Sequence, residues 1–216
     1  MQKLKGIVAA GEIGQILTIH ATCQAWLSQL GTHFMDYTLW INGGHHARAV
    51  VGHVHGRGKL SDSHPSCDYF LGEVLLANDV RAYIECGYFS PSHMDASHFW
   101  VDNRLTVYGT HGYAWADTDG RWGAFTRMSQ GQVMGEEGPT WGVQEKESLQ
   151  PLYLRDLADW LDDDTRVHPC NVEISYHGYE VLEGLCISAM DNTRVDLPLD
   201  VSKGYDMNER MRRELP

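Results

Sequence analysis

The order of β-rich and helical segments constrains this chain more than any other feature of its sequence. Segments rich in β-branched and aromatic residues follow one another through the middle of the chain, whereas helical periodicity is confined mainly to the flanks. Strands joined by short turns pair antiparallel, and segregated helices then pack together on the sheet. The order predicts an α+β fold, an open, mostly antiparallel mixed β-sheet with helices packed on one face. The expected strands are residues 16–26, 47–55, 69–76, 80–87, 104–108, 113–116, 120–126 and 195–199.

Four segments have the apolar spacing or composition of helices, at residues 2–10, 32–41, 149–161 and 172–190. Residues 2–10 are predicted to form the end of a helix that begins before this chain. Thr32 is a suitable N-cap for the second helix, and Pro169 suits the first turn of the last.

The remaining segments are predicted to be irregular. Residues 131–142 are rich in glycine and acidic residues, which indicates a surface loop. We expect one domain over residues 1–200, followed by a polar, loosely attached C-terminal tail at 201–216.

Composition excludes several classes of protein. The 216 residues carry a formal net charge of −12, so the chain repels nucleic-acid phosphates. No apolar stretch is long enough to span a bilayer, and the short apolar run at residues 6–10 does not make a signal peptide. The five cysteines are odd in number and form no Cys-x-x-Cys pair, which indicates reduced thiols in a cytoplasmic protein.

The glycines near the N-terminus do not form a dinucleotide-binding loop. A phosphate-binding fingerprint requires a strand before its glycines and a helix after them. Gly11 and Gly14 follow a predicted helix and precede a predicted strand, and the third glycine is absent. The chain therefore contains no evident Rossmann domain.

Residues 31–36 are the strongest candidate for catalysis. His33 lies in the first turn of a predicted helix, where the helix dipole favours the neutral imidazole of a general base. Asp36 lies about one turn further, where it can orient a neighbour or contact a hydroxyl group. For this pattern alone, a structural histidine that hydrogen-bonds to the backbone is more common than a catalytic one.

The other histidines and the aromatic residues are less specific. His53 and His55 share one face of a predicted strand, which can begin a zinc site, but spacing identifies no further ligands. Solvated or structural histidines are more common than metal ligands in such a pattern. The seven tryptophans and ten tyrosines suit a sugar site, although such residues more often belong to a core or an interface.

Together, four motifs resemble the C-terminal domain of the Gfo/Idh/MocA (glucose–fructose oxidoreductase / inositol dehydrogenase) family, in the family's order over about residues 1–200. Residues 5–16 resemble its helix–Gly-x-Ile-Gly–strand entry, and residues 31–36 with 39–41 resemble its Gly-x-His-x-x-Asp helix. Residues 107–112 resemble its strand and Gly-Thr-x-Gly turn. The family's final helix and strand are matched by residues 180–183, 188–189 and 195–199.

The resemblance implies hydride transfer between NAD or NADP and a sugar, cyclitol or related polyol. It assigns the catalytic proton transfer to His33 and places Gln29, Thr32 and Asp36 at the substrate. Two departures matter. First, Gln29 stands where many members carry an aspartate. Second, the Rossmann half, with the lysine of its Glu-Lys-Pro segment, is absent, so we expect that this chain by itself does not hold the nicotinamide in place.

Three hypotheses follow. In the first, the chain is the substrate side of an oxidoreductase and is inactive without a dinucleotide-binding half. In the second, it is a stand-alone, non-catalytic polyol-binding or oligomerisation domain. In the third, it is an enzyme that binds a metal through a histidine cluster, made of His45, His46, His53, His55, His93 and His98. We also expect a homodimer or higher homo-oligomer through the open sheet face, because no predicted helix remains to cover it.

Overall fold

A computed structural model describes residues 1–56, 67–94, 101–136, 149–204 and 206–215. It contains a single nine-stranded sheet in the order β8-β7-β6-β5-β1-β4-β3-β2-β9. Of the pairings between the described strands, only β1–β4 is parallel. The strands are β1 (Ile16–Cys23), β2 (Ala47–His55), β3 (Tyr69–Leu76), β4 (Arg81–Gly87), β5 (Asn103–Gly109), β6 (Gly112–Ala116), β7 (Arg121–Thr126), β8 (Gly131–Glu136) and β9 (Val195–Asp196).

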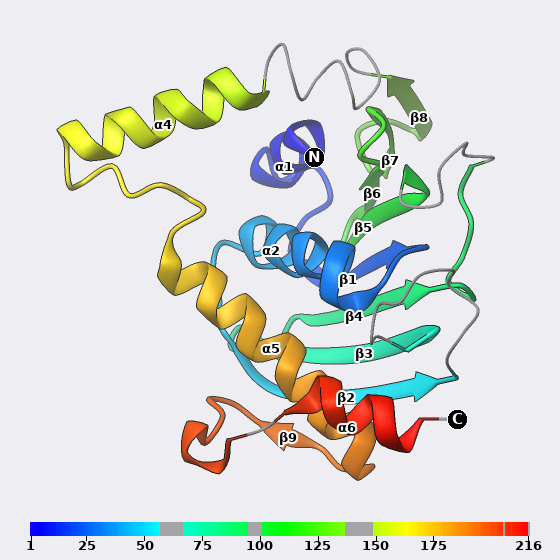
Figure 1. Cartoon of the computed structure of the whole chain (residues 1–216). Helices are drawn as coiled ribbons and strands as arrows, with labels where there is room; N and C mark the ends of the chain where they lie inside the picture. Colours follow the sequence, from blue (N-terminus) through cyan, green and yellow to red (C-terminus); the bar gives the residue numbers. More distant parts are fainter. Residues whose placement is uncertain (57–66, 95–100, 137–148, 205, 216) are drawn as a thin grey trace.

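Helices cover one face of this sheet, which confirms the predicted fold class, and one further helix, Gln150–Asp162, projects away from it (Figure 1). The helices are α1 (Gln2–Ala9), α2 (Thr32–Ile41), α4 (Gln150–Asp162), α5 (Val172–Asp191) and α6 (Met207–Glu214), with a π-helical segment η1 (Leu27–Gly31) and a 3₁₀ turn η4 (Val201–Lys203). Alternate residues of β3, among them Phe70, Val74 and Leu76, are buried beneath the helices. Those between them are only half-buried, since no described helix covers that face.

Helix α5 forms the centre of the core. The Asn171 side chain caps it by accepting hydrogen bonds from the backbone of Glu173 and Ile174. Leu185 is fully buried against β2 and β3, where a Cβ at Gly52 would lie 2.2 Å from the Leu185 carbonyl oxygen. Glycine at this position allows the helix backbone to approach the sheet closely.

Several local predictions were wrong. Thr32 does not cap α2, because η1 runs directly into that helix and Gly31 already has helical backbone angles. Pro169 lies before the Asn171 cap of α5. Residues 131–136 form strand β8 on β7; the rest of the expected loop, 137–142, lies outside the described residues.

The C-terminal segment also differs from its prediction. The strand expected at 195–199 is limited to Val195–Asp196. Within the predicted tail, α6 packs against α5, with Met207 and Met211 buried and Arg210 paired with Asp191 at 2.7 Å. Two methionines one turn apart were enough to attach an otherwise charged helix. The structure has no helix, within its described residues, that is long and apolar enough to cross a membrane.

Candidate functional site

The predicted site residues lie on η1 and α2, at the ends of the parallel strands β1 and β4. Gly31 permits this placement, because a Cβ there would lie 2.9 Å from Leu27 Cδ1 and 3.3 Å from Cys86 Sγ. The side-chain hydroxyl of Thr32 donates a hydrogen bond to the Gln29 carbonyl oxygen rather than capping a helix. The helix dipole argument for His33 is therefore weaker than predicted, since the helical backbone begins well before it.

The four predicted residues do not converge on one cavity. Gln29 and His33 are exposed on the helix surface. Thr32 lines a small pocket of about 70 Å³ beside α5 and α6. Asp36 is half-buried and lines a much larger pocket of about 580 Å³. The helix thus presents His33 to solvent and Asp36 to a cavity one turn away.

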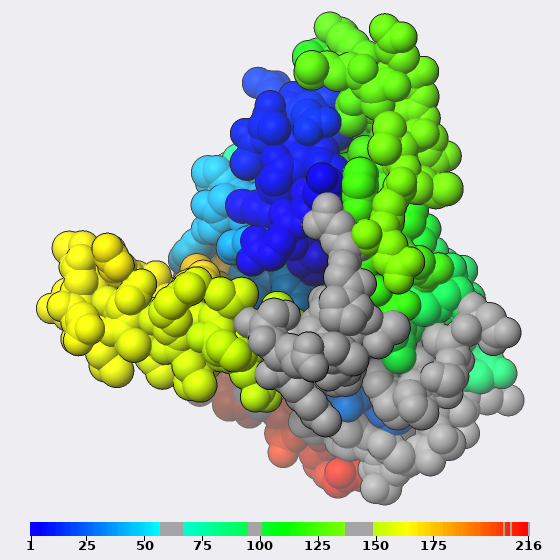
Figure 2. Space-filling model, turned by 90° about the horizontal axis from the view of Figure 1, so that it is seen from above, coloured from blue at the N-terminus to red at the C-terminus, as the bar shows by residue number. Residues whose placement is uncertain are grey.

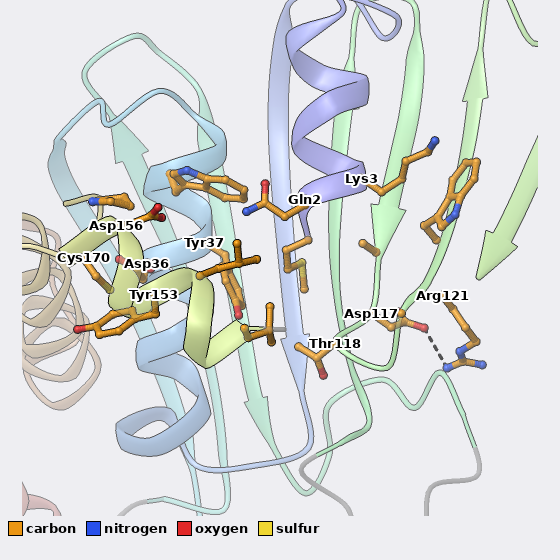
Figure 3. Close-up of a pocket in the computed structure, with 18 of the residues that line it drawn as sticks. Gln2, Lys3, Asp36, Tyr37, Asp117, Thr118, Arg121, Tyr153, Asp156 and Cys170 are labelled. Carbon is orange, nitrogen blue, oxygen red and sulfur yellow. Dashed lines mark ion pairs between the residues drawn. The ribbon is translucent and has the colours of Figure 1, made fainter. Parts of the chain in front are cut away.

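The large pocket lies between α1, α2, α4, the segment before α5, and the β6–β7 turn (Figure 3). Helix α4 extends away from the body of the molecule when the chain is seen from above (Figure 2), and none of its residues is buried. The polar and aromatic residues that line this pocket are Gln2, Lys3, Asp36, Tyr37, Trp40, Asp117, Thr118, Arg121, Trp122, Tyr153, Asp156, His168 and Cys170.

One end of the pocket combines Asp36 with Tyr37 and Cys170. Burial raises the pKa of the Asp36 carboxyl above its usual value, and the nearby His33 offsets this only in part. Burial also raises the pKa of Tyr37 and of Cys170, and the Asp36 charge raises both further. Tyr37 and Cys170 therefore stay protonated near neutral pH, and neither supplies a positive charge to Asp36.

His168 supplies a fixed hydrogen-bond donor to the same cavity. The side chain is 4% exposed, and its Nδ1 accepts a hydrogen bond from the Cys170 backbone at 3.0 Å. In the neutral ring the hydrogen then resides on Nε2. Within the described part of the chain no group accepts that hydrogen. The Tyr153 ring lies edge-on to His168, with centroids 4.7 Å apart.

The opposite wall is an ion-pair cluster. Asp117, whose side chain is fully buried, accepts two hydrogen bonds from Arg104, at 2.8 and 3.1 Å, and pairs with Arg121 at 2.9 Å. Lys3 lies 4.6 Å over the Trp122 ring. These contacts hold the β6–β7 turn rigidly, because a buried carboxylate with two guanidinium partners has little freedom to move.

Helix α1 is anchored to the end of α2. Lys5 Nζ donates to the carbonyl oxygens of Trp40 and Ile41, at 2.6 and 3.3 Å, and lies over the Trp40 ring. The lysine thereby satisfies carbonyl groups that lack partners at a helix C-terminus. Burial lowers the pKa of Lys5, and its amino group is bound to the carbonyl groups that end α2.

Sequence reasoning missed most of the pocket. Trp40 lies one helical turn after Asp36, so the spacing of α2 itself could have identified it. Asp117 and Asp156 come from segments distant in sequence, and no local pattern connects them to Asp36. His168 was also missed, because its role depends on a backbone hydrogen bond that only the folded turn creates.

The histidine cluster does not converge on a metal site. His53 and His55 are both exposed on β2, as their alternate spacing predicts. The described segments contain no group of three histidine, cysteine or acidic residues arranged to hold a metal ion.

The glycines of the turn between α1 and β1 allow that turn to pack closely against the segment around Thr110. Gly11 and Gly14 have φ angles of +71° and +76°, and a Cβ at Gly14 would lie 2.3 Å from the hydroxyl oxygen of Thr110. The turn joins α1 to β1 and leaves no open cradle for a phosphate. This turn therefore does not fit the phosphates of a dinucleotide.

Comparison with known proteins agrees with this architecture. Residues 1–115 match the profile of the GFO/IDH/MocA C-terminal domain. An oxidoreductase from Agrobacterium radiobacter, in complex with NAD+, L-tartaric acid and magnesium, is similar with a TM-score of 0.71 and 14% identity, over 90% of this chain and 60% of that chain. An NAD-binding oxidoreductase from Klebsiella pneumoniae has a TM-score of 0.71 and 15% identity, over 92% of this chain and 63% of that one.

A third similar structure is levoglucosan dehydrogenase in complex with NADH and L-sorbose, with a TM-score of 0.66 and 16% identity, over 90% of this chain and 62% of that chain. No curated protein sequence matches significantly. The chain belongs to the GFO/IDH/MocA family and has the fold of its C-terminal domain. It spans about 60% of the length of the solved structures it matches.

Proposed function

We propose that this chain is the substrate side of an NAD(P)-dependent oxidoreductase that acts on a sugar, cyclitol or related polyol. The observation that carries the proposal is the 580 Å³ pocket beside the family's histidine helix, with carboxylate, aromatic and imidazole groups in its walls. Aromatic faces and carboxylates suit a hydroxylated ring, which has apolar faces and a polar rim. Since the described turn at Gly11 and Gly14 forms no phosphate cradle, we propose that a separate dinucleotide-binding domain binds the nicotinamide.

The similar structures support the same chemistry. Two of them hold NAD+ or NADH together with small hydroxylated molecules, L-tartaric acid and L-sorbose. Whether this protein uses NAD or NADP depends on the dinucleotide-binding domain, because that domain contacts the ribose that distinguishes them.

In the proposed reaction His33 removes the hydroxyl proton of the substrate while hydride leaves the carbon. The exposed His33 imidazole, one helical turn from Asp36, can accept this proton when the substrate extends from the pocket to it and the partner domain encloses both. Gln29, four residues earlier, can donate a hydrogen bond but cannot supply the charge of an aspartate. Asp36 and Thr32, on the same helix, are proposed to contribute to substrate binding.

The test is turnover by the protein purified together with its dinucleotide-binding domain, followed by NAD(P)H absorbance with a panel of sugars and cyclitols. His33→Ala should lower kcat by about 100-fold or more, the usual contribution of a general base, with little change in KM. His45→Ala, which changes another exposed histidine, is the matched control. Wild-type turnover in the His33 variant would remove this residue from the mechanism.

A second candidate function is a non-catalytic polyol-binding or oligomerisation domain. The open sheet face favours it: Tyr69 and His20 both hydrogen-bond Glu85 there, at 2.7 and 3.1 Å, and no described helix covers them. We propose that two or more copies associate through this face. Sedimentation at micromolar concentration tests it, and a monomer would exclude self-association. Polyol binding without turnover, even with a dinucleotide-binding domain present, would favour this second function.

A further inference from the structure

One end of the large pocket holds basic residues together with an ion-paired carboxylate, and the other end holds carboxylates alone (Figure 3). Lys3, Arg121 and Asp117, the ion-pair partner of Arg121, lie on one side of the view, near α1 and β7. The residues on the other side, beside α2 and α4, are Asp36, Tyr153, Asp156 and Cys170. No lysine or arginine is among the lining residues of this acidic end, and Lys5 nearby is bound to the carbonyl groups that end α2.

Asp36 is the least compensated charge at the acidic end. No described residue donates a hydrogen bond to its carboxylate or forms an ion pair with it. Among the described residues, the nearby group that can carry a positive charge is His33, one helical turn before it. A half-buried carboxylate without a partner is unfavourable, and a bound cation would compensate it directly.

The surrounding groups suit a small organic cation with hydroxyl groups. The Tyr37 and Tyr153 side chains lie near Asp36 (Figure 3), Trp40 also lines the pocket one helical turn after Asp36, and aromatic faces attract ammonium groups. The Nε2 hydrogen of His168, a residue 4% exposed that lines this end, has no acceptor among the described residues. It can therefore donate to a hydroxyl or ring oxygen of the same ligand.

We propose that the acidic end of this pocket binds the protonated amine of an aminated polyol, an amino sugar or an aminocyclitol. Asp36 is the principal counter-ion, and Asp156 on α4 is a second carboxylate at the same end. The inference rests on the proposed polyol function and names its substrate class more narrowly. A neutral polyol would leave the Asp36 charge uncompensated, and an acidic sugar would be repelled by both carboxylates.

The experiment is calorimetric titration of the full chain with D-glucosamine and D-glucose, which differ by one amino group. At a pH where the amine is protonated, glucosamine should bind about tenfold more tightly or better, since hydrogen bonds to a charged donor are the stronger ones. Asp36→Asn should reduce this preference to nearly one, and Asp156→Asn should reduce it in part. Asp164→Asn, an exposed residue that does not line the pocket, is the control and should retain the preference.

A second readout does not depend on any variant. Raising the pH until the amine loses its proton should bring the affinity for glucosamine down to that for glucose. Equal binding of the two sugars at the lower pH would overturn the amine assignment and leave the polyol function intact. Binding of neither would overturn both, and a preference that survives in Asp36→Asn and Asp156→Asn together would overturn the placement at this pocket.

Discussion

Helices α4 and α5 have the same kind of apolar pattern but opposite environments. Residues 149–161 and 172–190 both show apolar side chains at helical spacing, and both segments are helical in the structure. In α5 eleven of twenty residues are buried, whereas α4 buries none. Leu154 and Leu161 of α4 are 61% and 77% exposed, while Leu185 of α5 is fully buried.

The difference shows what amphipathic spacing means physically. Periodicity indicates that a helix has an apolar face, but not which surface covers it. Helix α5 lies on the glycines of β2 and β3, so the sheet itself covers its apolar residues. The apolar face of α4 is covered by no such surface among the described residues, and an exposed face of this kind is typical of an interaction site.

The largest expected effect comes from truncating one leucine on each helix. Leu185→Ala should lower the free energy of unfolding by about 2–5 kcal/mol, since it leaves a cavity against a rigid sheet. Leu154→Ala on α4 should change it by less than about 0.5 kcal/mol, because that side chain is already in solvent. Urea unfolding of both variants measures the difference. Equal losses would mean that α4 is packed in solution as α5 is.

A smaller effect is expected from the polar contacts of the two helices. His177 of α5 accepts a hydrogen bond from the Ala47 backbone at 2.9 Å and pairs with Glu180 at 3.2 Å, both residues being buried. His177→Ala should cost about 1–3 kcal/mol, since it leaves a buried N–H without an acceptor. Arg166→Ala, which breaks an exposed pair with Asp159 on α4, should cost less than about 1 kcal/mol.

The same histidine gives the core a dependence on pH. Burial lowers the pKa of His177 below its usual value of 6.5, and the stacked His46 adds to this, while Glu180 opposes it. Protons then bind the unfolded state more readily than the folded state. The contribution of His177 to the free energy of unfolding is therefore fully present above about pH 6.5 and is lost as the pH falls below that value. Unfolding midpoints of wild type and His177→Ala should therefore converge with acid. A constant gap between pH 7 and 5 would contradict the assignment.

Charges on the apolar face of α4 should leave stability nearly unchanged. The double substitution Leu154→Glu and Leu161→Glu should shift the melting temperature by no more than about 2 °C, since neither side chain is buried. It should also reduce binding of a dye that fluoresces on exposed apolar surface. A large loss of stability would show that this face is covered in the folded chain.

The smallest effect is expected at Asp36, where α2 meets the pocket. Because burial raises the pKa of this carboxyl, its ionised form opposes folding above the usual carboxyl pKa. Asp36→Asn should therefore slightly raise the melting temperature at neutral pH, with the gain vanishing as the pH falls below the usual carboxyl pKa. A loss of stability at neutral pH would indicate that the carboxylate has a partner in solution.

The fold was predictable from local pattern because its strands alternate and its turns carry the expected residues. Asp79, with a positive φ angle, closes the β3–β4 hairpin where the Asn-Asp pair predicts a turn. Strand β8 was missed because glycine and acidic residues are poor strand formers, and pairing with β7 overrides that preference. Helix α6 was missed because, of its residues whose burial is described, only Met207 and Met211 are buried.

The sequence by itself determined the class of the fold and the location of the histidine helix, because both depend on periodicity and on residues adjacent in the chain. The tertiary structure alone decided which side chains surround Asp36. Tyr153 and His168 reach the pocket from segments more than 100 residues away, and their positions depend on packing and on a backbone hydrogen bond. It also decided that α5 is buried and α4 is not, since burial depends on which surfaces the folded chain brings together.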